Sequence, residues 1–239
     1  MKTTAALAIA LLAAAAAPRA AEEIAFRGEG GYELRGTYWA ATAPGPCVLL
    51  LHQCNRDRTA YASLAPALAA AGMHVFAFDF RGFGESIGEG AGSFRERSEE
   101  LWPLFAADVD AALAVLAARP GVDGARVGIL GASCGGSQAL LASSRHAGVR
   151  ALAFLSSSLP WLVDAEIEAF ETGRSIPLLC IAAEEDRGTY ERTKRIFQSS
   201  TNPETRLLLY KGNAHGAALF DQDPSLVGTI VDWFGRRLR

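Results

Sequence analysis

A serine lies between two glycines at the point where an apolar stretch of the chain gives way to a helical pattern. Gly131, Ser133 and Gly135 form a Gly-x-Ser-x-Gly motif. The mostly apolar residues 127–130 come before it, and an alanine- and leucine-containing pattern follows to about residue 144. Strand, sharp turn and helix are the setting of a nucleophile elbow, where the residues two places from the nucleophile must lack bulky side chains. The motif predicts Ser133 as a nucleophile, with the positive end of a helix beside its hydroxyl.

Two other interpretations of this segment stay open. In the frame Ala132–Gly136, the motif centres on Cys134, with alanine in place of the first glycine. Glycine on both sides favours Ser133 over Cys134. The motif can also occur in an ordinary strand–helix turn, because the chain has 24 glycines.

An acyl-transfer site also needs a base and an acid. His215 lies between small residues in a loop after a predicted strand, which makes it the natural general base among four histidines. Asp186 follows another predicted strand and could orient the histidine and stabilise its cation. Glu184 and Glu185 are expected to be solvated loop acids.

Two backbone N–H groups are expected to stabilise the oxyanion. One belongs to the residue after the nucleophile, Cys134. The other comes from the polar segment after the strand 47–51, with Cys54 as first choice and Gln53 as second. His52 precedes the nucleophile in the chain, and we expect it to be a structural hydrogen-bonding residue of this loop.

The hydrophobic pattern predicts an α/β fold. The expected strands cover residues 23–27, 32–39, 47–51, 74–80, 127–130, 149–155, 177–183 and 205–210, and the expected helices cover residues 60–71, 99–118, 135–144, 190–198 and 226–237. Residues 81–97 are expected to be a loop. Alternating strands and helices indicate a parallel sheet, to which the first two strands add an antiparallel hairpin. Polar clusters after several strands then meet at the carboxyl edge of the sheet.

From about Ile24 onward the chain resembles an α/β-hydrolase of the dienelactone hydrolase-like serine esterases. The resemblance rests on Leu50-Leu51-His52, on the Asp-x-Arg-Gly-x-Gly-x-Ser pattern of residues 79–86, and on the order Ser, Asp, His. It implies a mostly parallel twisted sheet with an N-terminal antiparallel hairpin, helices on both faces and a minimal lid. It also implies the triad Ser133, Asp186 and His215.

The resemblance further implies that Asp79 and Arg81 are structural supports of the site. Two departures from the family pattern stand out. Gln53 occupies a position where the family commonly has glycine, and Ser133 stands where dienelactone hydrolases themselves have a cysteine nucleophile.

Composition and the N-terminal segment indicate which partners and which cell compartment to expect. The net charge is −3 and no basic run is present, so nucleic-acid binding has no electrostatic basis. Residues 1–21 resemble a secretory signal peptide, with an apolar core too short to span a bilayer. We expect residues 22–239 to form one hydrolase domain, periplasmic or secreted, with no stable membrane insertion after leader removal.

The chain has four cysteines, and an oxidising compartment would permit disulfides. If Cys54 and Cys134 both supply oxyanion amides, their backbones converge, and a disulfide between them is a hypothesis. Cys47 and Cys180 lie in predicted buried strands and are expected to be inert core thiols. No spacing of cysteines or histidines indicates a metal, and no cofactor is implied.

The expected function is cleavage of carboxylic esters with small acyl groups through an acyl-enzyme. Gln53 and Trp161 are candidate substrate contacts in a fairly open cleft, with Trp102 and Phe94 as further wall residues or core. A peptidase or thioesterase with the same triad is an alternative, as is a non-catalytic binding protein on the same fold. Oligomeric state is not predicted.

Overall fold

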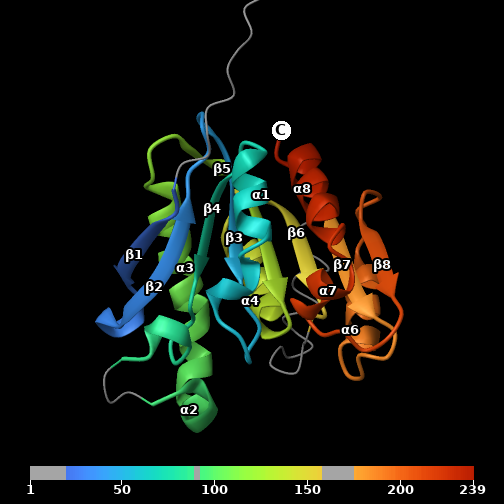
Figure 1. Cartoon of the computed structure of the whole chain (residues 1–239), viewed down its shortest axis with the longest axis horizontal. Coiled ribbons are helices and arrows are strands. Elements are labelled where there is room, and N and C mark those ends of the chain that lie inside the picture. The colour runs from blue at the N-terminus through green and yellow to red at the C-terminus, as the bar shows by residue number, and fades with distance from the viewer. Residues whose placement is uncertain (1–19, 89–91, 158–174) are drawn as a thin grey trace, which may run out of the picture.

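An eight-stranded mixed sheet forms the centre of the computed structural model, which describes residues 20–88, 92–157 and 175–239 (Figure 1). The strands are β1 (Glu22–Arg27), β2 (Glu33–Trp39), β3 (Gly45–Leu51), β4 (His74–Phe78), β5 (Val122–Ala132), β6 (Val149–Leu155), β7 (Leu178–Ala183) and β8 (Arg206–Tyr210). Their order in the sheet is β1-β2-β4-β3-β5-β6-β7-β8. β1 pairs with β2 and β2 with β4 in antiparallel fashion, and all other pairs are parallel. The predicted mixed α/β sheet with an N-terminal hairpin is confirmed.

The two faces of the sheet carry separate hydrophobic cores. The helices are α1 (Leu64–Ala70), α2 (Phe94–Leu101), α3 (Phe105–Ala117), α4 (Cys134–Arg145), α6 (Tyr190–Ser199), α7 (Ala218–Gln222) and α8 (Leu226–Arg237). Leu49 and Leu51 of β3 belong to the core under α3 and α4, whereas Val48 and Leu50 belong to the core under α1 and α8. Successive side chains of a strand point to opposite faces, so the continuous apolar run of β3 is what a strand covered on both sides requires.

One predicted helix is two helices in the structure. The pattern of residues 99–118 predicted a single helix, but α2 and α3 are separated by a 3₁₀ helix over Trp102–Leu104. Pro103 has no N–H to continue the hydrogen-bond ladder and its ring clashes with the preceding turn. α2 also begins inside the predicted loop, where the Ser93 N–H donates to Glu96 Oε2 at 2.8 Å in a capping box.

Smaller differences concern element ends. α1 begins at Leu64, after a 3₁₀ helix over Arg58–Tyr61, and Pro66 is tolerated because it lies in the first turn. β4 ends at Phe78 rather than at residue 80, and α7 was not predicted. Residues 1–19 of the predicted leader and Trp161 lie outside the described residues. The minimal-lid prediction rests on the shortness of residues 86–98 and 156–175, of which residues 89–91 and 158–174 also lie outside the description.

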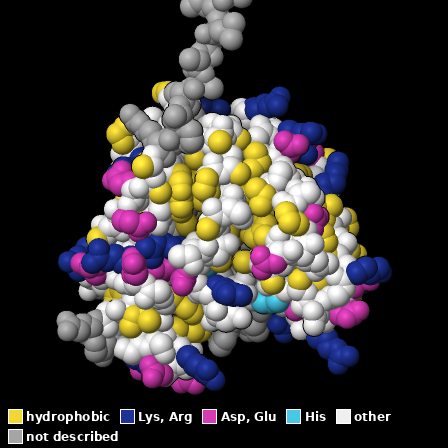
Figure 2. Space-filling view, viewed as in Figure 1, with side chains coloured by type: hydrophobic (Ala, Val, Ile, Leu, Met, Phe, Trp, Pro, Cys, Tyr) yellow, Lys and Arg dark blue, Asp and Glu magenta, His cyan; other side chains and the backbone are white. Residues whose placement is uncertain are grey.

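The space-filling view shows acidic and basic side chains close together around the edges of the visible face (Figure 2). Apolar side chains gather between them, over the helices α1 and α8. Within the described ranges, no helix combines the length and the hydropathy that a bilayer crossing demands.

Candidate active site

Ser133 lies in the sharp turn between β5 and α4, with a left-handed backbone at φ 49° and ψ −117°. A Cβ atom on Gly131 would lie 2.3 Å from the Gly135 carbonyl oxygen, and one on Gly135 would lie 2.3 Å from the Leu51 oxygen. Only glycine fits at both positions, which is the steric reason for the motif. Ser133 is the N-cap residue of α4, so it lies at the positive end of that helix. Its side chain makes no capping hydrogen bond to the helix.

Asp186 and His215 are joined directly. His215 Nδ1 lies 2.8 Å from Asp186 Oδ2, and the Thr189 hydroxyl donates to the same carboxylate oxygen at 2.5 Å. Asp186 is 9% exposed, whereas the His215 side chain is one-third exposed. If Nδ1 carries the proton donated to the carboxylate, Nε2 of the neutral ring is left as a base. Glu184 and Glu185 are exposed, as expected of solvated loop acids.

The loop that carries His215 is tied to the elbow through β6. The Ser133 N–H donates to the Leu155 carbonyl oxygen at 2.9 Å, and the Gly216 N–H donates to the hydroxyl of the next residue, Ser156, at 3.0 Å. Ser156 is fully buried and has a left-handed backbone at φ 50°. Among the described contacts no hydrogen bond joins Ser133 to His215. In enzymes without substrate such bonds are often long and tighten only in the Michaelis complex.

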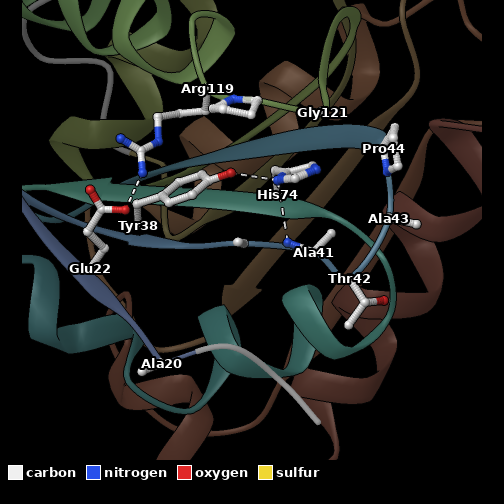
Figure 3. Close-up of a pocket in the computed structure, with 12 residues that line it drawn as sticks. Ala20, Glu22, Tyr38, Ala41, Thr42, Ala43, Pro44, His74, Arg119 and Gly121 are labelled. Carbon is white, nitrogen blue, oxygen red and sulfur yellow. Dashed lines mark hydrogen bonds and ion pairs between the residues drawn. The ribbon is translucent and has the colours of Figure 1, made fainter. Parts of the chain in front are cut away.

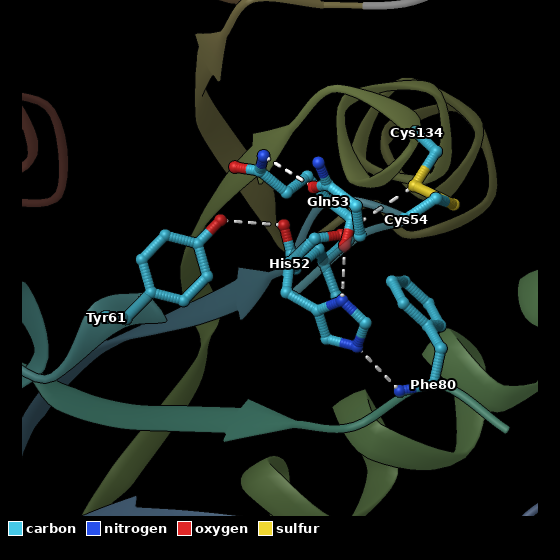
Figure 4. The surroundings of a disulfide bond; sticks show 8 residues. His52, Gln53, Cys54, Tyr61, Phe80 and Cys134 are labelled. Atoms are coloured by element: carbon cyan, nitrogen blue, oxygen red, sulfur yellow. Dashed lines mark hydrogen bonds between the residues drawn. A yellow bond between two sulfur atoms is a disulfide. The ribbon is translucent and has the colours of Figure 1, made fainter. Parts of the chain in front are cut away.

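His52 holds the loop after β3 against the end of β4 (Figure 4). The Phe80 N–H donates to Nε2 of His52 at 3.0 Å, so the proton of the neutral ring lies on Nδ1, 2.9 Å from the Gln53 carbonyl oxygen. Complete burial lowers the pKa of His52, because charging the ring in an apolar site is unfavourable. The expected structural role of His52 is confirmed.

Gln53 is almost fully buried and both polar atoms of its side chain are engaged within the protein. Nε2 donates to Asn55 Oδ1 at 2.7 Å, and Oε1 accepts from the Ala217 N–H at 2.7 Å. Gln53 therefore connects the loop after β3 to the loop that carries His215. Sequence reasoning missed this contact and that of Ser156, because neither residue type signals its partner.

Cys54 and Cys134 form a disulfide, with their Cα atoms 5.9 Å apart (Figure 4). The hypothesised pairing is confirmed. It also removes the frame centred on Cys134, since a sulfur in a disulfide has no thiolate for attack. Cys47 and Cys180 are free and buried, and burial raises the pKa of each thiol to about 12. They are the inert core thiols that the sequence predicted.

Asp79 and Arg81 form buried ion pairs with other parts of the fold. Buried Asp79 accepts from the Arg58 N–H at 2.7 Å and forms an ion pair with the Arg58 guanidinium. Buried Arg81 binds the carboxylate of Asp108 on α3 through two nitrogens. Arg58 and Asp108 were not predicted, since nothing in the sequence reveals which charges pair across the fold.

Of the proposed wall residues, Phe94 belongs to the buried core, where its ring stacks on Phe83. Trp102 packs against Phe105 at the edge of that core. Trp161 lies outside the residues that the structure describes.

A pocket of about 500 Å³ lies far from Ser133, at the amino ends of β3 and β4 (Figure 3). The Tyr38 hydroxyl lies 2.6 Å from His74 Nδ1, and the Arg119 guanidinium stacks on the Tyr38 ring and pairs with Glu22. These contacts join the hairpin to the end of α3, so we assign them to the fold and not to the candidate site. In the described ranges, no cluster of three or more His, Cys, Asp or Glu could hold a metal ion.

Solved structures of similar fold include esterases and a dienelactone hydrolase. The chain is similar to a cold-adapted esterase from an Arctic intertidal metagenomic library, with a TM-score of 0.74, 17% identity, and coverage of 92% of this chain and 94% of the esterase. It is also similar to dienelactone hydrolase from Anabaena variabilis (TM-score 0.70, 20% identity, 92% and 99% covered). An esterase from Pyrococcus furiosus has a TM-score of 0.72 at 16% identity, with 92% of both chains covered. At these identities the likeness concerns the fold.

Two curated relatives are uncharacterized proteins of Mycobacterium tuberculosis, from strains CDC 1551 and H37Rv. Each is 33% identical over 123 residues, which is 51% of this chain and 40% of the relative. This chain therefore matches less than half the length of either relative. The family model described as serine aminopeptidase, S33, matches residues 42–171, which is more than half of the 239 residues. The matched segment includes β3, the elbow and α4. Because the match covers more than half of the chain, the protein belongs to the serine aminopeptidase S33 family of α/β-hydrolases.

Proposed function

We propose that this protein is a serine hydrolase that cleaves carboxylic esters with small acyl groups. Ser133 is the nucleophile, His215 the general base and Asp186 the residue that orients His215. The observation that carries the proposal is the 2.8 Å contact of His215 Nδ1 with the buried carboxylate of Asp186. The loop that carries His215 is also bonded to Ser156, and the residue before Ser156, Leu155, accepts the Ser133 N–H. The fold shared with esterases supports an ester as substrate.

In the proposed reaction, Ser133 Oγ attacks the ester carbonyl carbon while His215 Nε2 accepts the hydroxyl proton. The backbone amides of Cys134 and Cys54, with Gln53 as the alternative to Cys54, stabilise the oxyanion. The protonated histidine then donates to the leaving alcohol, and an acyl-enzyme remains. Water, deprotonated by His215, attacks the acyl group, and the carboxylic acid leaves as Ser133 regains its proton. Asp186 accepts the hydrogen bond from Nδ1 and stabilises the imidazolium.

The test combines covalent labelling with turnover. Wild type, Ser133→Ala and Ser144→Ala are treated with a fluorophosphonate and assayed on nitrophenyl esters of graded acyl length. Ser144 is an exposed residue of α4, the helix that begins directly after Ser133, and its hydroxyl donates to the Leu141 carbonyl oxygen. Its variant is therefore a matched control. We expect wild type and Ser144→Ala to label and to turn over short esters, and Ser133→Ala to do neither. A wild-type protein that never labels would be no serine hydrolase.

The name of the matched family favours aminopeptidase activity as the second candidate. Aminoacyl nitroanilides added to the same panel distinguish the two. A higher kcat/KM for an aminoacyl nitroanilide than for any short ester would assign the protein to the peptidases, whereas the ester proposal expects the reverse.

We also propose that the protein is exported to the periplasm or secreted. The apolar leader pattern of residues 1–21 supports this, and so does the disulfide, because such bonds persist in oxidising compartments. Cell fractionation with mass measurement of the mature chain tests it. Protein found in the cytosol with its leader intact would contradict export.

A further inference from the structure

The disulfide joins two segments that lie 80 residues apart in the chain. Cys134 is the first residue of α4, directly after Ser133, and Cys54 lies in the loop after β3. Within the described residues, the other two cysteines, Cys47 and Cys180, remain free in strands of the sheet. The covalent bond therefore connects the nucleophile turn with the loop that faces it.

These two segments are the ones that would supply the oxyanion amides under the proposed function. They already approach closely, since Cys134 Sγ lies 3.9 Å from the His52 carbonyl oxygen. A Cβ atom on Gly135 would lie 2.7 Å from that same oxygen. The backbones of residues 52–54 and 133–135 are therefore packed directly against each other.

The loop after β3 has two hydrogen-bonded anchors directly before Cys54. His52 is bonded to the Phe80 N–H of the segment after β4, and Gln53 is bonded to the Ala217 N–H of the loop that carries His215. Neither of these hydrogen bonds reaches the nucleophile turn. The disulfide of Cys54 is the covalent link between this loop and the nucleophile turn.

Donors in an oxyanion hole are effective because they are held in place before charge develops, so that no reorganisation is needed during reaction. A loop attached to the nucleophile turn by hydrogen bonds and packing alone can shift its amide by fractions of an ångström. A bond between the side chains of the two donor residues restricts that shift directly.

We propose that the Cys54–Cys134 disulfide is a positioning element of the oxyanion hole, so that the oxidised protein is the efficient catalyst and reduction lowers kcat. The inference rests on the proposed function. In the reduction, a dithiol gives two electrons and two protons, the sulfur–sulfur bond breaks to two thiols, and the dithiol closes to a cyclic disulfide.

The test compares ester turnover of oxidised wild type, wild type in dithiothreitol, Cys54→Ala and Cys54→Ala/Cys134→Ala. The matched control is Cys47→Ala/Cys180→Ala, which removes two buried thiols and keeps the disulfide. Circular dichroism accompanies each assay, at a temperature well below the unfolding midpoint of the reduced protein. We expect kcat to fall about 10- to 100-fold in the reduced protein and in both Cys54 variants, with KM changed by less than about twofold.

A disulfide that only stabilised the fold would lower the unfolding midpoint and leave kcat unchanged in the folded protein. Folded Cys54→Ala or reduced wild type with the kcat of oxidised wild type would overturn the inference. If the double variant does not fold, the reversible loss of kcat in dithiothreitol and its return on reoxidation carry the test. The control variant should keep full kcat when oxidised and the same loss in dithiothreitol.

Failure of the proposed function has a different signature. An oxidised wild type that neither turns over esters nor reacts with a fluorophosphonate contradicts both the function and this inference. An oxidised wild type that does both, with no change on reduction of the folded protein, contradicts this inference alone.

Discussion

The side-chain oxygen of Gln53 accepts a hydrogen bond at 2.7 Å from the N–H of Ala217, a residue 164 positions later. This bond joins the loop after β3 to the loop that carries His215. A residue expected to contact substrate thus connects two parts of the candidate site, and its second polar atom is engaged by Asn55.

Gln53→Met should lower kcat by up to about tenfold, since the partly buried Ala217 N–H loses a hydrogen bond worth about 0.5–1.5 kcal/mol and the His215 loop loses an anchor. Methionine keeps the size of the side chain and removes the acceptor. Steady-state turnover of a short nitrophenyl ester measures the effect. Gln222→Met, on an exposed glutamine that donates to the Lys211 carbonyl oxygen, is the control and should match wild type. A folded Gln53→Met with wild-type kcat would rule out this role.

Asp186→Asn should lower kcat by about three to four orders of magnitude. The asparagine NH2 would donate to Nδ1 of His215, where the carboxylate accepts from it. The ring proton would then lie on Nε2, so the nitrogen proposed as the base could not accept the Ser133 proton. Turnover and fluorophosphonate labelling rate should fall together. Glu185→Gln, one position earlier and exposed, should leave both unchanged. Equal losses in the two variants would place the acid elsewhere.

Gly135→Ala should both destabilise the protein and reduce turnover. The new methyl group would press on the backbone oxygens of Leu51 and His52, which cannot move without displacing the loop after β3. Overpacking of this kind costs about 1–3 kcal/mol of unfolding free energy. Gly235→Ala in α8 is the control, because its Cβ would meet open space, and it should stabilise by about 0.5–1 kcal/mol. Urea unfolding compares the two variants, and equal free energies of unfolding would contradict the steric argument.

Stability should fall as the pH decreases below about 6.5, the ordinary pKa of histidine, because burial lowers the pKa of His52 in the folded protein. Between the lowered folded pKa and about 6.5 the unfolded chain binds the extra proton, so acid favours unfolding. The contribution of His52 is complete above this window and is lost as the pH falls through it, with a slope of about 1.4 kcal/mol per pH unit at most. Urea unfolding across this range should show a steeper dependence for wild type than for His52→Asn. Identical slopes would mean that His52 titrates normally when folded.

The sequence was sufficient for most of the sheet and for the elements at its centre. Continuous apolar runs predicted β3 and β7, and alternating apolar and polar residues predicted the hairpin of β1 and β2, because each pattern follows from how many faces of a strand are covered. The interruption by Pro103 was readable in principle, as was the capping box at Ser93. The helical period of residues 99–118 outweighed the proline signal, and the glycine-rich, charged composition of residues 81–97 led to the prediction of a loop where the capping box lies.

The nucleophile turn was the most predictable part of the site. A left-handed residue with close backbone neighbours excludes side chains at Gly131 and Gly135, so the requirement is written into consecutive residues. A carboxylate and an imidazole after later strands could be proposed as partners, since parallel strands end at one edge of the sheet.

Only the tertiary structure decided which distant side chains meet. It paired Cys54 with Cys134, tied Gln53 to Ala217, and set Arg58 against Asp79. These contacts depend on the directions of Cβ atoms brought together across tens of residues, and neither residue type nor periodicity specifies such directions. The sequence by itself determined the strands, the strained turn and the chemistry available at the sheet edge, because those follow from local sterics and burial, whereas the three-dimensional packing determined how that chemistry is held.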